Sequence, residues 1–125
     1  MELLRVENLC KVYGEGNNKV VALDHVSFNV NKGEFVAIIG PSGSGKSTVL
    51  HILGGVDQPT EGKVYMDDVD IYLQNEEQLA IFRRRHVGLI YQFYNLIPVL
   101  NVRENMTLPV LMDGQRVNEE RLEEL

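Results

Sequence analysis

The chain has 125 residues, of which 44% are hydrophobic and 24% are charged, as in a soluble globular domain. A net charge of −6 argues against a broad nucleic-acid surface, and no apolar run approaches the ~20 residues that cross a bilayer. The single cysteine, Cys10, excludes an internal disulfide, and His25 and His86 show no spacing typical of metal ligands. We therefore expect one cytoplasmic domain with no nucleic-acid partner.

The first forty residues have the pattern of β-structure. Apolar residues recur among polar ones up to Tyr13, and the glycine-rich segment 14–18 indicates a loop. Residues 20–30 then alternate between mostly apolar and mostly polar side chains. A turn at 31–33 precedes residues 34–39, which are almost wholly apolar and predict a strand buried on both faces. One face of the strand at 20–30 is mostly apolar and carries Ala22, Asp24, Val26, Phe28 and Val30.

A glycine-rich loop follows the predicted strand at 34–39 and matches G-x-x-x-x-G-K-[ST] without a gap. Glycines let the backbone turn its N–H groups toward phosphate oxygens, and a helix predicted at 46–53 adds its positive end. Lys46 can span the β- and γ-phosphates, Ser47 offers a hydroxyl to Mg²⁺, and Thr48 can reach the α-phosphate. The phosphate-binding residues are therefore Gly40, Pro41, Ser42, Gly43, Ser44, Gly45, Lys46, Ser47 and Thr48.

Further elements are predicted beyond the loop. Gly54 and Gly55 end the first helix, and Asn75 or Gln74 can start a second. Asn101 and Glu104 have the offset of a capping box, which predicts a helix from Val102 whose end Pro109 makes difficult to place. The predicted elements are a turn at 59–62, strands at 63–66 and 87–91, and helices at 76–85, from 102 onward and at 117–125.

Two residues outside the loop are candidates for the nucleotide site. Gln92 follows the predicted strand at 87–91, so its amide would emerge at the carboxyl edge of a sheet, where it could contact Mg²⁺ or orient the attacking water. By itself, a polar residue that only ends a strand is the simpler interpretation. Tyr13 ends the first strand, where packing and stacking on a base are both open interpretations.

The sequence as a whole resembles the ATP-binding domain of ABC transporters. The resemblance implies an α/β fold: a P-loop NTPase of ABC type with an N-terminal antiparallel β subdomain and a partial, truncated RecA-like parallel-sheet core. It also implies that ATP and Mg²⁺ bind, that Tyr13 stacks on adenine, that Lys46 and Gln92 serve catalysis, and that Ser47 and Gln92 bind the metal. The segments that carry it are 9–13, 27–40, 59–71 and 87–98.

Within this family, residues 53–57 and 92–98 are most similar to the macrolide-export and lipoprotein-release subfamily. The resemblance divides the domain at about residue 92, with a β subdomain and phosphate-loop core before it and the start of a helical subdomain at 93–125. It implies a second ATP-binding subunit, a membrane-spanning permease that contacts Gln92 to Leu100, and a peripheral position at the inner face of the cell membrane. Packing within the domain is an equally open interpretation of residues 93–100.

Several family motifs do not occur in these 125 residues: the L-S-G-G-Q signature, the aspartate motif with its catalytic Glu, and the switch His. Asp67 and Asp68 follow three apolar residues, but they align with a family hairpin, in which Asp68 replaces a glycine and tolerates the left-handed conformation. We therefore expect the full-length protein to hydrolyse ATP and residues 1–125 alone to bind nucleotide without catalysis. Without strands to flank 34–39, apolar surface should be exposed, which favours instability, oligomers or swapping. A soluble ABC ATPase without a transporter partner is the alternative.

Overall fold

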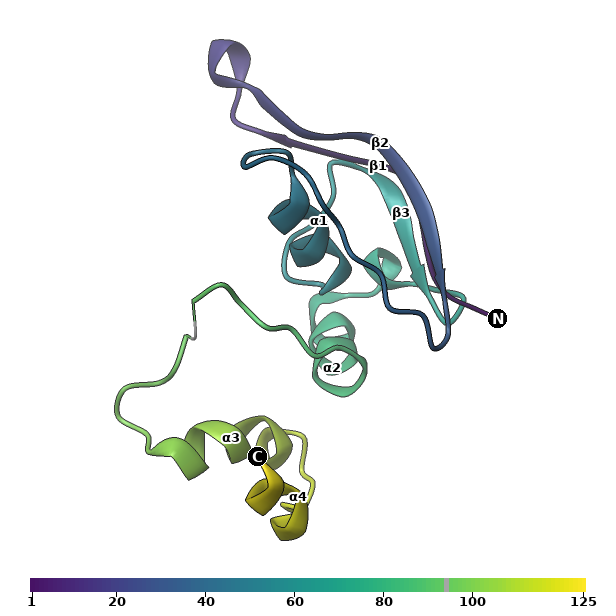
Figure 1. Ribbon diagram of the computed structural model, residues 1–125. Helices are drawn as coiled ribbons and strands as arrows, with labels where there is room; N and C mark the ends of the chain where they lie inside the picture. The colour runs from purple at the N-terminus through teal and green to yellow at the C-terminus, as the bar shows by residue number, and fades with distance from the viewer. Residues whose placement is uncertain (94) are drawn as a thin grey trace.

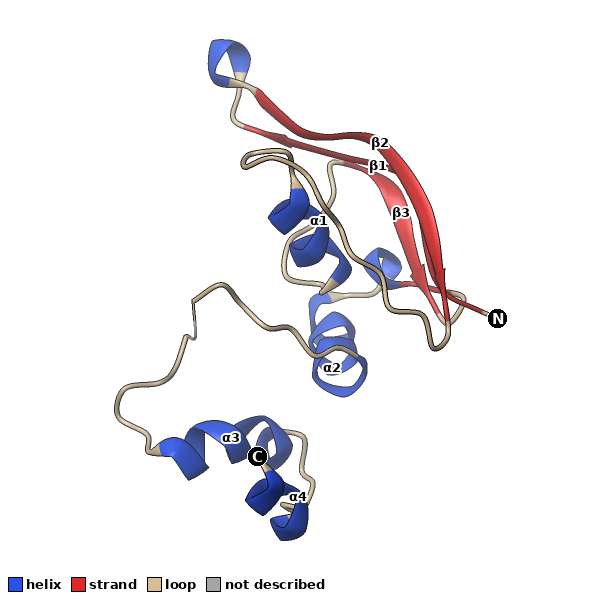
Figure 2. Ribbon diagram, viewed as in Figure 1, coloured by secondary structure: helices blue, strands red, loops and turns tan. Residues whose placement is uncertain are grey.

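The computed structural model describes residues 1–93 and 95–125, so Tyr94 lies outside the described residues. One antiparallel sheet runs along one side of the molecule, with the strand order β2-β1-β3-β4 (Figures 1 and 2). The short 3₁₀ helix η1 (Gly16–Asn18) connects the first two strands. The predicted strands at 20–30 and 63–66 are confirmed. The strands are β1 (Glu2–Tyr13), β2 (Val20–Asn31), β3 (Glu61–Met66) and β4 (Val69–Asp70).

β2 contains a bulge that changes which side chains face the core. Leu9 of β1 pairs with Val26, whereas Lys11 pairs with Leu23, so β2 has one extra residue at this point. His25 adopts a φ of 50° there. The predicted apolar face is therefore correct from Val26 onward but wrong at Asp24, which is exposed, while Leu23 is buried.

The first three helices begin where the sequence predicts them, and the last begins at Glu119, two residues later than predicted. Side-chain capping boxes at Asn75 and Asn101 start the second and third helices, which explains why these starts could be located. Pro109 lies inside the third helix, which continues to Met112. Among the described residues, no helix is long and apolar enough to span a bilayer. The helices are α1 (Lys46–Leu53), α2 (Glu76–His86), α3 (Val102–Met112) and α4 (Glu119–Glu124), with the 3₁₀ helix η2 (Ile71–Leu73) before α2.

The hydrophobic core lies between the sheet and the helices α1 and α2. Leu9 of β1, Ile52 of α1, Val64 of β3 and Ile71 of η2 are completely buried within it. The last two helices stand apart from the sheet (Figure 1). Asp113, just after α3, accepts hydrogen bonds from two arginines of α2 and so ties the last helices to the core.

Two predicted strands are not strands in the structure. Residues 34–39 and 87–91 run as loops, and Phe35, Ile39 and Ile90 are 99%, 89% and 97% exposed. A strand needs a neighbour to take up its backbone N–H and C=O groups, and in the described part of the chain no strand pairs with either segment. The apolar composition of these two segments favours burial, but it does not determine which strand would pair with them. Among the described residues, the sheet is therefore the antiparallel one formed by β2, β1, β3 and β4, which corresponds to the predicted β subdomain.

Candidate phosphate-binding site

The glycine loop passes close to β2. Gly43 and Gly45 have φ values of 81° and 93°, in the region that favours glycine. At Gly45 a Cβ atom would lie 2.5 Å from the carbonyl oxygen of Ala22 and 3.1 Å from a methyl of Leu23. Only glycine therefore lets the chain turn here against the strand. The loop is closed on its other side by the Ser44 N–H, which donates to the Pro41 carbonyl at 3.2 Å.

The start of α1 is open to an anion. Gly45 is the N-cap residue, and no side chain in the described residues caps this helix. The first N–H groups of an α-helix have no partner within the helix, and the helix dipole makes this end positive. Such an end is a ready site for phosphate oxygens.

Lys46 adds a full positive charge to the same loop. Its ammonium folds back and donates to the carbonyl of Gly40 and, at 3.0 Å, to that of Pro41. These two carbonyls hold the side chain over the loop.

A cleft of about 440 Å³ opens beside the loop. Of the described residues that line it, Lys46 is the one cation and none is a carboxylate, so its field favours anions. The structure thus brings Gln92 together with most of the predicted loop residues. Gly40 and Pro41 do not line the cleft, but their carbonyls accept hydrogen bonds from Lys46, which does. The lining consists of Val20, Val21, Ala22, residues 42–48 and Gln92.

Gln92 and Ser47 also line a second cleft of about 480 Å³, together with His51 and Tyr91. The prediction that Gln92 follows a strand is wrong, because residues 87–91 form a loop. Gln92 was nevertheless predicted to act beside Ser47, and both residues line each of the two clefts.

Tyr13 lies at the end of β1 and is outside the lining of the phosphate cleft. Its hydroxyl donates to Asp57 at 2.7 Å, and Lys11 donates to the other oxygen of the same carboxylate at 3.1 Å. Tyr13 is 41% exposed, and the Lys11 ammonium lies 5.0 Å from the centre of its ring. The hydrogen bond to Asp57, with burial, raises the pKa of Tyr13. Sequence reasoning did not identify Asp57 as a site residue, although it lies in the segment 53–57 that resembles the subfamily.

The charge pattern around Asp57 lowers its own pKa. Burial raises the pKa of this carboxyl, but the hydrogen bonds from Tyr13 and Lys11 outweigh that effect and bring the pKa below its usual range. The carboxylate is therefore ionised and occupied as an acceptor.

Asp67 and Asp68 form the tight turn between β3 and β4, with φ values of 49° and 63°. Asp67 lies 3.5 Å from Lys32, and its N–H donates to Leu3 at the start of β1. Neither aspartate lines the phosphate cleft. The interpretation of this segment as a hairpin is confirmed.

Known proteins similar to the chain were found by sequence and by structure. A profile of the family described as "ABC transporter" matches residues 23–125. The ABC transporter ATP-binding protein MJ0796 of Methanocaldococcus jannaschii is 42% identical over 121 residues, which are 95% of this chain and 52% of that protein. Its structure as a dimeric, post-hydrolysis ATP-binding cassette bound to ADP and Pi superposes with a TM-score of 0.87 over the same shares of the two chains.

Two further relatives carry names from transport systems. The lipoprotein-releasing system ATP-binding protein LolD of Coxiella burnetii is 42% identical over 112 residues, 90% of this chain and 48% of that protein. The macrolide export ATP-binding/permease protein MacB of Brucella abortus is 42% identical over 119 residues, 95% of this chain and 18% of that protein. The chain spans about half the length of the first two relatives. The ABC-type fold and the likeness to the macrolide-export and lipoprotein-release subfamily, both predicted from the sequence, are confirmed.

Proposed function

Because the chain belongs to the ABC transporter family of ATP-binding domains, we propose that residues 40–48 bind the phosphates of ATP and that the full-length protein hydrolyses ATP to power export across a membrane. The observation that carries this proposal is the glycine loop at the uncapped start of α1, with Lys46 folded over it. N–H groups, helix dipole and ammonium all present positive charge to one cleft. A nucleoside triphosphate is the anion that suits this loop.

The residues at the cleft take different parts in this proposal. The loop N–H groups hold the phosphates, and Lys46 leaves its carbonyl partners to contact the β- and γ-phosphates. The Ser47 hydroxyl and the Gln92 amide oxygen are the candidate ligands of Mg²⁺, and they fit because both line the same cleft and Mg²⁺ prefers oxygen donors. Bound there, the metal would neutralise charge on the β- and γ-phosphates. Gln92 alternatively orients the attacking water.

Tyr13 is the proposed platform for adenine. Its support is an exposed ring at the end of β1 and a hydroxyl whose pKa, raised by Asp57 and by burial, is lowered slightly by the nearby side chain of Thr48 in the loop. A ring near the α-phosphate end of the loop lies on the side where a base would extend. Tyr13→Phe should keep MgATP affinity, because the stacking face remains, whereas Tyr13→Ala should weaken it.

The decisive substitution is Lys46→Ala. Loss of the ammonium should remove most MgATP binding by residues 1–125, measured by titration with a fluorescent ATP analogue, and should abolish hydrolysis by the full-length protein. Lys19→Ala, an exposed lysine in the loop between β1 and β2, is the matched control and should change neither. Unchanged turnover in the Lys46→Ala protein would contradict the proposal.

Residues 1–125 on their own are proposed to bind nucleotide without hydrolysing it. The support is that no carboxylate lines the cleft in the described part of the chain, so no general base stands beside the γ-phosphate position. Phosphate release by the purified chain, above that of its Lys46→Ala variant, would overturn this part of the proposal and leave the binding site intact.

The segment from Gln92 to Leu100 is the proposed contact with a membrane-spanning permease. Phe93, Leu96 and Val99 are 74%, 65% and 88% exposed, and apolar side chains gathered on a surface loop are typical of a protein contact. Through that partner the protein would lie at the inner face of the membrane. A second ATP-binding subunit is the other proposed partner, supported by the dimeric state described for MJ0796.

The permease contact has a direct test. Leu96→Glu together with Val99→Glu should abolish co-purification of the full-length protein with its permease and leave MgATP binding unchanged. Leu73→Glu, at a residue that is 82% exposed elsewhere, is the control. Full co-purification of the double variant would contradict the proposed surface and would favour the soluble, non-transporter ATPase.

A further inference from the structure

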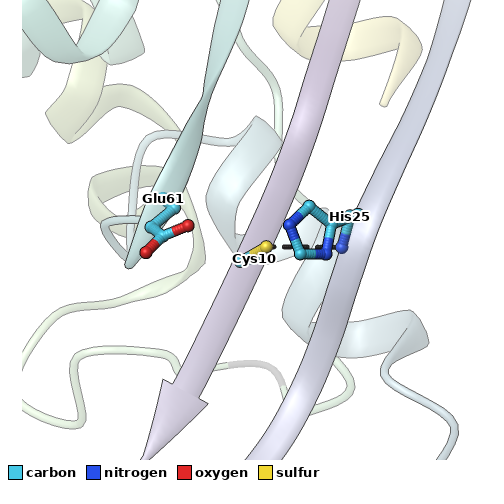
Figure 3. Close-up of side chains that lie close together, drawn as sticks. All are labelled: Cys10, His25 and Glu61. Carbon is cyan, nitrogen blue, oxygen red and sulfur yellow. Dashed lines mark hydrogen bonds between the residues drawn. The ribbon is translucent and has the colours of Figure 1, made fainter.

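Three side chains with different metal-binding groups meet on neighbouring strands. Cys10 comes from β1, His25 from β2 and Glu61 from β3, and one ligand atom of each lies within 4.8 Å of the others. Figure 3 shows the cysteine on the middle strand, with the imidazole on one side and the carboxylate on the other. Thiolate, imidazole and carboxylate are the three kinds of side-chain group that bind zinc in proteins.

The strand register explains why these residues meet. Cys10 pairs directly with Glu61 across β1 and β3. The bulge in β2 places Asp24 and His25 opposite the single residue Cys10, and the positive φ of His25 turns its backbone so that the His25 N–H donates to the Cys10 Sγ at 3.3 Å. Without the extra residue in β2, the imidazole would not stand beside the sulfur.

The imidazole is already oriented for a metal. Its Nδ1 lies 2.6 Å from a carboxylate oxygen of Asp24, which leaves Nε2 as the free nitrogen. Histidines that bind metals regularly use one ring nitrogen for the metal and give the other to a carboxylate, which fixes the ring and raises its basicity. Asp24 is therefore a supporting residue of the cluster.

We propose that Cys10, His25 and Glu61 form a Zn²⁺ site. Zinc accepts sulfur, nitrogen and carboxylate ligands in a tetrahedron, and its bond lengths of about 2.0–2.3 Å separate neighbouring ligand atoms by roughly 3.3–3.8 Å. The three atoms need to draw together by at most about 1.5 Å for this geometry. His25 and Glu61 are exposed and have room to move, and water completes the fourth position. Mg²⁺ and Ca²⁺ take oxygen ligands and do not suit the thiolate.

The proposed zinc site is separate from the phosphate cleft. Leu9 is buried against Ile52 of α1, and because successive side chains of a strand point to opposite faces, Cys10 points to the face away from α1. None of the three ligands lines the cleft beside the glycine loop. Bound zinc would join β2, β1 and β3 and would stabilise the sheet by mass action without touching the nucleotide.

The test is a Co²⁺ titration of the metal-stripped, reduced chain without a polyhistidine tag, followed by competition with Zn²⁺. The expected result is a thiolate-to-cobalt charge-transfer band that saturates at one metal per chain and is displaced by zinc. Cys10→Ser should remove the band. His25→Asn, which tolerates the positive φ, and Glu61→Gln should each weaken zinc binding at least tenfold, and Asp24→Asn should weaken it by about tenfold.

His86→Asn is the matched control, because it removes an exposed histidine of α2 far from the cluster and should leave the affinity unchanged. Circular dichroism checks that each variant is folded, and His25→Asn and Glu61→Gln still decide the matter if Cys10→Ser does not fold. The absence of a cobalt–sulfur band in the wild-type chain overturns the proposal. Equal zinc affinity of the wild type, His25→Asn and Glu61→Gln also overturns it, because the thiol alone would then bind the metal.

Discussion

At the scale of single residues, two glycines of the phosphate loop share a positive φ but have different surroundings. A Cβ atom at Gly43 would meet nothing within 4 Å, whereas one at Gly45 would meet the Ala22 carbonyl oxygen at 2.5 Å. The first position therefore needs glycine only for its backbone conformation. The second needs it also for the close approach to β2.

This difference predicts unequal effects of alanine. Gly43→Ala should cost about 1–2 kcal/mol, the penalty of a left-handed backbone for a residue with a Cβ. Gly45→Ala should cost clearly more and should also abolish MgATP binding, because the loop must move away from β2. Urea unfolding and nucleotide titration of both variants measure this, and equal losses at the two positions would contradict the role of the Ala22 contact.

Asp57 links pH to stability. Its pKa is below the ordinary value of 3.8, since the hydrogen bonds from Tyr13 and Lys11 outweigh the effect of burial. A carboxyl with a lowered pKa stabilises the fold above its unfolded pKa, and this contribution disappears as the pH falls through the folded value. The side chain of Asp57 is 32% exposed, so solvent limits the contribution to about 1 kcal/mol or less.

Asp57→Asn should therefore reduce the free energy of unfolding near neutral pH by that small amount. The gap between wild type and variant should begin to close below about pH 4, where the unfolded carboxyl takes up its proton, and should keep closing as the pH falls toward the lower pKa of the folded protein. Urea unfolding from pH 6 to pH 3 measures the gap. A difference that stays constant over this range would show that the carboxylate charge is not its cause.

At the scale of elements, the turn between β3 and β4 is strained at two aspartates. Both Asp67 and Asp68 have positive φ, the conformation of a two-residue hairpin turn that favours Asn-Gly or Asp-Gly. Asp68 occupies the second position, where glycine is preferred, and places a second negative charge next to the first.

Asp68→Gly should stabilise the protein by about 1 kcal/mol, because it removes the Cβ penalty and the like-charge repulsion. The Asp68→Ala variant keeps the penalty and removes only the charge, so it separates the two causes. Thermal unfolding of the three proteins measures this. A lower midpoint for Asp68→Gly than for the wild type would show that chain entropy outweighs the strain.

The sequence predicts elements well where a local cause defines them. Capping by Asn75 and Asn101 located two helix starts, and Gly45 and Gly54 bracket α1, because each signal acts within one turn. The strands at 34–39 and 87–91 failed because pairing is a long-range property that composition does not contain. The bulge in β2 was missed for the same reason: nothing in the alternation of residues 20–30 indicates an extra residue until the register with β1 is known.

The candidate site also has a part that the sequence predicts and a part that it does not. The loop residues and Lys46 follow from a contiguous motif, and the neighbourhood of Gln92 follows from family resemblance. Asp57 and the cluster of Cys10, His25 and Glu61 depend on contacts between distant segments, so spacing along the chain could not reveal them.

At the scale of the whole molecule, apolar loops remain on the surface. Phe35 and Ile90 are almost fully exposed on the two segments that were expected to form buried strands. Backbone groups without a strand partner and exposed apolar side chains together favour association with another chain. Residues 1–125 should therefore self-associate.

Sedimentation velocity should show larger species of the isolated chain at micromolar concentration, increasing as the concentration rises. Phe35→Ser together with Ile90→Ser should reduce this association, because two of the most exposed apolar side chains are removed. Val102→Ser, at a residue that is 77% exposed on α3, is the control. A monomer at all concentrations would contradict the expectation.

The pairing of β1 with β3 also determines the order in which the molecule folds. β1 and β2 are adjacent in the sequence, whereas Cys10 and Glu61 are roughly fifty residues apart and enclose the phosphate loop and α1. Closing the longer segment costs more entropy, so the hairpin of β1 and β2 should form first and β3 should join later. Since Val64 of β3 packs in the same core as Ile52 of α1, the helix that presents the phosphate loop is fixed only in that later step. During refolding, the ability to bind nucleotide should therefore lag behind the appearance of the hairpin.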